Sequence, residues 1–85
     1  MKEISYQIKD ELGLHARPAA FLVKAAGKYK CKITISKENK TTDAKSILGV
    51  MGLGAKKGEV VKLVFNGVDE VAAAVELEAF LKENL

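Results

Sequence analysis

The chain is poor in the residues that build disulfides and metal centres. Its 85 residues include one cysteine, one histidine, one proline and no tryptophan. The single cysteine, Cys31, cannot form an internal disulfide, and its alternation with Ile33 and Ile35 indicates a buried strand residue without chemistry. No group of cysteines and histidines has metal-ligand spacing, so we expect neither a metal nor a cofactor.

Long apolar runs and nucleotide loops are missing as well. No stretch approaches the ~18 apolar residues of a membrane span, and the N-terminus lacks the order of a signal peptide. We therefore expect a cytoplasmic protein that does not insert into membranes. Gly49 and Gly54 have the spacing of a phosphate-binding loop, but Ala55 stands where its lysine should follow and no Ser or Thr follows Lys56.

Composition predicts one small globular domain, residues 1–85, with 48% apolar and 29% charged residues. The net charge is +3, and the densest basic cluster is Lys28, Lys30 and Lys32 around Tyr29. With only one aromatic residue interleaved, this cluster is typical of a solvated face, so we expect no direct binding of nucleic acid. A basic surface suits an acidic protein partner, and we expect a monomer.

Hydrophobic periodicity alternates between the strand and the helix repeat. A period of two marks three core-facing strands, at Ile4, Tyr6 and Ile8, at Cys31, Ile33 and Ile35, and at Val61, Leu63 and Phe65. Helical spacing joins Ala19, Leu22, Val23 and Ala26, and later Ala73, Ala74, Leu77, Phe80 and Leu81.

Turn and capping residues divide these segments. Gly27 ends the first helix by taking a left-handed conformation, and Glu38-Asn39 turns into a short edge strand at 40–43. Asp69 caps the final helix. The order strand, helix, strand, strand, helix, strand, helix predicts an α+β fold, with the helices on one side of a mainly antiparallel sheet.

The short helix between these strands begins at Ser46, a good N-cap. Val50 and Leu53 point to one side of it, whereas Ile47, Leu48 and Met51 gather on another. Two interpretations stay open: the second group is an exposed patch for a partner, or the helix is buried on both sides.

His15, the only histidine, falls where the strand pattern stops and a helical pattern begins. Pro18 suits the first turn of a helix, so His15 lies at or beside a helix N-terminus. Free N–H groups, the helix dipole and an exposed Arg17 favour an anion there, and the dipole favours the neutral imidazole. His15 is thus a candidate phosphoryl acceptor; the alternative is a solvated cap.

Two motifs carry a resemblance. Gly13-Leu14-His15-Ala16-Arg17-Pro18-Ala19 is similar to the active-site signature of HPr, the histidine-containing phosphocarrier family of the phosphoenolpyruvate-dependent sugar phosphotransferase system. Lys45-Ser46-Ile47-Leu48-Gly49-Val50-Met51 resembles the regulatory serine region of its Gram-positive branch. The likeness implies an open-faced sandwich, βαββαβα, with a four-stranded antiparallel sheet in the order one, four, two, three and three helices on one face.

The resemblance also implies residue roles. His15 would take a phosphoryl group on Nδ1 from Enzyme I and pass it to sugar-specific Enzyme IIA, so the protein would be a carrier and not an enzyme. Arg17 and the N–H groups of Ala16 and Arg17 would stabilise that group. Ser46 would be modified by HPr kinase/phosphorylase, and the modified form would bind the catabolite control protein. The apolar docking surface would be Leu14, Ala20, Ile47, Leu48 and Met51.

Two positions depart from the family pattern, and two other functions compete with the carrier. Leu12 stands where relatives commonly have a small or polar residue, and Gly52 where many have serine. A regulatory binding module that acts through phosphorylated Ser46 is one alternative, although it would have no need of His15. A small enzyme of the acylphosphatase type is the other, but its arginine-asparagine pairing is not visible.

Overall fold

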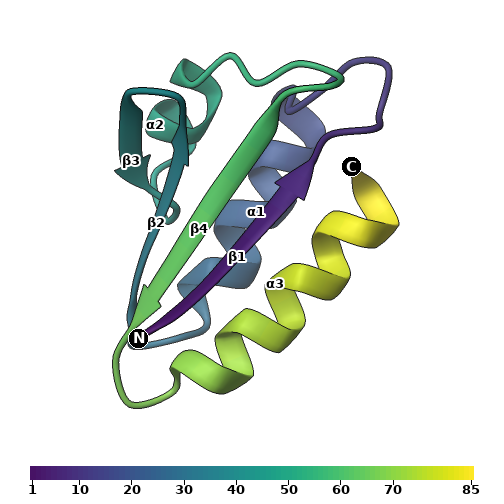
Figure 1. Ribbon diagram of the computed structural model, residues 1–85. Helices are drawn as coiled ribbons and strands as arrows, with labels where there is room; N and C mark the ends of the chain where they lie inside the picture. Colours follow the sequence, from purple (N-terminus) through teal and green to yellow (C-terminus); the bar gives the residue numbers. More distant parts are fainter.

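The computed structural model describes all 85 residues as an α+β fold. Four strands form one antiparallel sheet in the order β1-β4-β2-β3, as the resemblance implied. Three helices cover one face of this sheet and leave the other open, which is an open-faced sandwich (Figure 1). The elements are β1 (Lys2–Gln7), α1 (Ala16–Gly27), β2 (Lys32–Lys37), β3 (Lys40–Asp43), α2 (Ile47–Gly52), β4 (Val60–Asn66) and α3 (Glu70–Asn84). None of the helices is both long and apolar enough to cross a membrane.

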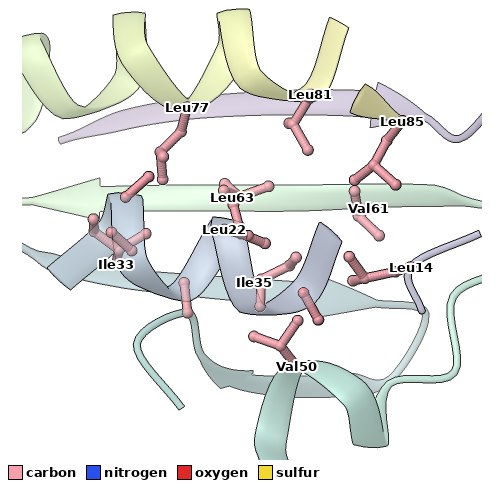
Figure 2. Packing of buried hydrophobic residues seen from close by; sticks show 14 of the residues in the cluster. Leu14, Leu22, Ile33, Ile35, Val50, Val61, Leu63, Leu77, Leu81 and Leu85 are labelled. Atoms are coloured by element: carbon pink, nitrogen blue, oxygen red, sulfur yellow. The ribbon is translucent and has the colours of Figure 1, made fainter. Parts of the chain in front are cut away.

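The core lies between the sheet and the helices. The alternation in β2 and β4 turns Ile33, Ile35 and Leu63 inward, and all three are fully buried. Leu22 of α1 and Leu77 of α3 meet them from the helical layer (Figure 2). Cys31 is buried just before β2 and is free, as predicted, and burial is the main cause that raises the pKa of its thiol.

The first helix and the β2–β3 hairpin follow the sequence closely. The expected bounds of α1 are confirmed, but Gly27 does not take the left-handed conformation; Lys28 ends the helix, and its N–H bonds to Ala25 O. Glu38 has a φ of 54° in the predicted two-residue turn. The strand that follows, β3, is an edge strand, as predicted.

The predicted cap of α3 is confirmed in its position, because Asp69 is the N-cap residue, but not in its side-chain bond. Asp69 precedes the helix but makes no side-chain capping bond. Its carboxylate instead accepts the N–H groups of Lys30, at 2.8 Å, and Cys31, at 2.9 Å. The two donors precede β2, so Asp69 ties the start of α3 to the α1–β2 connection, and a long-range contact replaces the local one.

The carboxylates of Asp69 and Glu76 predict a loss of stability in acid. The backbone N–H of Lys30 lowers the pKa of Asp69, and the ammonium group of Lys28 lowers that of Glu76. Folding thus favours their ionised forms, and this stabilisation is present at neutral pH and lost as the pH falls through the folded-state pKa values. The urea concentration at the midpoint of unfolding should decrease below about pH 4.5. Asp69→Asn should be less stable at pH 7 and less sensitive to acid; an unchanged acid dependence would contradict the assignment.

Candidate functional site

His15 occupies the residue that begins α1. It is the N-cap, with the extended angles φ −87° and ψ −174°, and its side chain makes no capping bond. The ring is 37% exposed. The first N–H groups of a helix have no partner within the helix. Because Pro18 has no backbone N–H group, Ala16 and Arg17 supply the free donors of this turn. The position predicted from the sequence is therefore observed.

His15 opens into a surface pocket of about 250 Å³. Its lining residues are Asp10, His15, Arg17, Pro18, Phe21 and Asn84. Arg17 is exposed and brings a guanidinium group to the same pocket as the imidazole. A forked cation and a helix N-terminus together suit a phosphate-sized anion beside the ring.

Asp10 sets the polarity around the ring. Its Oδ2 atom lies 3.9 Å from His15 Nε2, too far for a direct hydrogen bond but close enough for a carboxylate to attract a proton on that nitrogen. In the neutral tautomer with the proton on Nε2, the lone pair of Nδ1 is free.

The loop before His15 is held by backbone contacts. Gly13 has a φ of 67°, and its N–H bonds to Asp10 O at 3.1 Å. Leu14 N–H donates to Ala55 O at 2.9 Å, which ties the loop to the connection between α2 and β4. Two backbone hydrogen bonds therefore hold the loop that precedes His15.

Ser46 caps α2, as predicted: its Oγ accepts the N–H of Gly49 at 3.1 Å. The alternative of a helix buried on both sides is wrong, because Ile47, Leu48 and Met51 are 38%, 82% and 43% exposed. They form an apolar patch, hereafter the α2 patch, whereas Val50 and Leu53 are buried as expected.

Removal of the Ser46 cap should cost stability. The hydroxyl satisfies one of the orphan N–H groups of α2, so Ser46→Ala should lower the free energy of unfolding by about 1 kcal/mol. Ser46→Asp keeps an acceptor at the cap and should cost less. Urea unfolding at neutral pH measures both, and an alanine variant as stable as the wild type would contradict a structural contribution of the cap.

The prediction for Leu14 as a docking residue needs correction. Its side chain is 5% exposed and belongs to the core (Figure 2). Backbone bonding through Ala55 turns this residue inward, so Leu14 positions His15 without offering surface to a partner. Ala20, in contrast, is exposed on α1.

Sequence reasoning missed part of the pocket. The sequence pattern gave no role to Asp10 or to Phe21, which is 54% exposed. Asn84 comes from the far end of the chain, so no local pattern could have placed it beside His15. Asn84 reaches the pocket because Lys9 and Asp10 donate their N–H groups to Leu85 O at 2.6 and 2.8 Å.

Comparison with known proteins assigns this geometry to a family. A family model described as the PTS HPr component phosphorylation site matches residues 2–83. The chain belongs to the HPr family. It is 42% identical over 83 residues to the phosphocarrier protein HPr of Lysinibacillus sphaericus, a match that covers 98% of this chain and 94% of that protein.

Solved HPr-type structures confirm the fold. The crystal structure of HPr-C-His from Thermoanaerobacter tengcongensis is 46% identical and has a TM-score of 0.93, with 98% of this chain and 93% of that chain covered. Crh of Bacillus subtilis, solved as a dimer with a swapped domain, is 34% identical with a TM-score of 0.78, and 100% of this chain and 98% of that chain are covered. Because HPr-type folds include a dimer, the monomer expected here stays a prediction. The HPr family is the phosphocarrier family of the phosphotransferase system.

Proposed function

We propose that this HPr-family chain carries a phosphoryl group on Nδ1 of His15, taken from Enzyme I and given to sugar-specific Enzyme IIA. The observation that supports it most directly is the shared pocket of His15 and Arg17 at the start of α1. Nδ1 forms a bond to phosphorus as the bond between phosphorus and the donor atom of Enzyme I breaks, and the donor atom keeps that electron pair. The guanidinium group and the N–H groups of Ala16 and Arg17 stabilise the charge on the transferring oxygens. Such a carrier works in the cytoplasm.

The proposed docking surface for both partners is Ala20 together with the α2 patch. Ala20 lies on the exposed face of α1, and α1 and α2 pack against each other. Apolar side chains beside the phosphoryl site let a partner exclude water while the group moves. The flexible Met51 side chain adapts to partners of different shape.

Phosphorylation with phosphoenolpyruvate and Enzyme I tests the carrier function. We expect an acid-labile, base-stable adduct, and mass spectrometry at neutral pH should place it on His15. His15→Ala should give no adduct. A wild-type chain that stays unmodified, or an adduct that survives in His15→Ala, would overturn the proposal.

We further propose that HPr kinase/phosphorylase modifies Ser46 and that the modified chain binds the catabolite control protein. A phosphate at the N-cap of α2 is compatible with the helix dipole, so it need not unfold the helix. It would place negative charge at the edge of the α2 patch and repel an acidic Enzyme I. Ser46→Asp should therefore slow phosphorylation of His15 by Enzyme I, whereas Ser46→Ala should not; equal rates would contradict this regulation.

The similarity to Crh supports one other candidate, a regulatory module that acts through phosphorylated Ser46. Transport assays separate it from the carrier. A carrier with Ser46→Ala loses regulation and keeps phosphoryl transfer, whereas a purely regulatory module shows no transfer through His15 in either form.

A further inference from the structure

Leu12 is an apolar side chain displayed next to the phosphoryl site. It is 73% exposed, although its neighbours Gly13 and Leu14 are buried. It belongs to the turn between β1 and α1, and this turn lies at the end of the molecule where α3 finishes (Figure 1). Single exposed apolar side chains are common on protein surfaces, so the position of Leu12 beside the pocket, and not its exposure alone, points to a contact in a complex.

The turn that carries Leu12 is rigidly bonded. Leu12 N–H donates to Asp10 Oδ2 at 3.0 Å, and Gly13 N–H closes the turn on Asp10 O at 3.1 Å. Asp10 is itself bonded to Leu85 O at 2.8 Å. The backbone under Leu12 is therefore ordered before any partner arrives, which reduces the entropy lost when its side chain is buried.

One oxygen atom links Leu12 to the reacting ring. The Oδ2 atom that accepts Leu12 N–H is the atom 3.9 Å from His15 Nε2. For transfer, the phosphorus atom carried by the donor protein must approach the accepting nitrogen of His15 to about 3–3.5 Å. A protein surface brought that close must also cover the adjoining turn. Phe21, 54% exposed, lines the pocket itself, so apolar side chains lie in and beside it.

We infer that Leu12 is a docking residue that the phosphoryl-donor protein buries in an apolar depression of its own surface. This inference rests on the proposed carrier function and adds to the α2 patch a second apolar contact, from a different segment. The contact is apolar and not ionic, because the leucine side chain carries no charge. Its contribution should therefore change little with salt concentration.

The test uses the whole chain with Enzyme I. Leu12→Ser should raise both the Kd for Enzyme I, measured by calorimetry, and the KM of phosphoryl transfer by about tenfold, the effect expected for loss of one buried leucine side chain. The kcat should be unchanged because Leu12 touches no reacting atom. Leu12→Met should restore wild-type values, and the increase should be the same at low and high salt.

Val68→Ser is the matched control. Val68 is 92% exposed in a turn, but it precedes α3, whereas the pocket residue Asn84 ends that helix about 20 Å away. It should leave Kd and KM unchanged. A Leu12→Ser variant within twofold of the wild type, or a wild type that does not bind Enzyme I, would overturn the role of Leu12. A wild type that binds Enzyme I but accepts no phosphate would overturn the carrier function alone, and the Kd comparison would still decide the role of Leu12.

Discussion

Replacement of Gly13 by alanine should lower the free energy of unfolding by about 3 kcal/mol and displace His15. The φ of 67° is strained for any residue with a Cβ atom. That Cβ would also stand 2.5 Å from Ala55 O and 2.9 Å from Lys56 Cα. Both neighbours are backbone atoms, so no side-chain rotation can relieve the clash and the loop must separate from its support.

Two other glycines separate the contribution of backbone strain from that of the steric clash. Gly54 has a φ of 61° with open space around its Cβ position, so Gly54→Ala measures the backbone strain alone, about 1 kcal/mol. Gly27 has neither strain nor a close neighbour, so Gly27→Ala should be neutral or slightly stabilising. Urea unfolding of the three variants gives the comparison. If Gly13→Ala were no more destabilising than Gly54→Ala, the close approach to Ala55 would not matter for stability.

Replacement of Arg17 by alanine should reduce kcat/KM for phosphorylation by Enzyme I about 10²-fold, if His15 is the acceptor. The guanidinium shares the pocket with the imidazole and supplies a forked set of donors to the transferring oxygens. Arg17→Lys keeps the charge but loses the fork, so it should recover only part of the rate. Stopped reactions analysed for phosphohistidine measure the three rates.

Lys24→Ala controls for the loss of positive charge from α1. Lys24 is also exposed on this helix, but it does not line the pocket. Enzyme I should phosphorylate the Lys24→Ala variant at nearly the wild-type rate. Any decrease in rate should disappear at high salt because exposed charges are screened. Equal losses for Arg17→Ala and Lys24→Ala would indicate general electrostatic attraction of the donor and contradict a specific role for Arg17.

Local patterns predicted the elements well because each depends on neighbours in the chain. Alternation of apolar residues at Ile33 and Ile35, or at Leu63 and Phe65, requires one face of a sheet to be buried, and the structure buries them. Asp69 shows where such reasoning fails. Its side chain had a local partner available, but the backbone donors at Lys30 and Cys31 compete for the same carboxylate and are visible only after folding.

The sequence alone determined the α+β class, the position of His15 at the start of a helix and the cap at Ser46, since periodicity and capping act over a few residues. The tertiary structure decided which side chains reach the pocket and which stay on the surface. It brought Asn84 to His15, placed Asp10 against the ring, buried Leu14 and exposed Leu12. The physical reason is that these arrangements depend on hydrogen bonds between segments distant in the chain, such as those to Ala55 O and Leu85 O, which no local pattern contains.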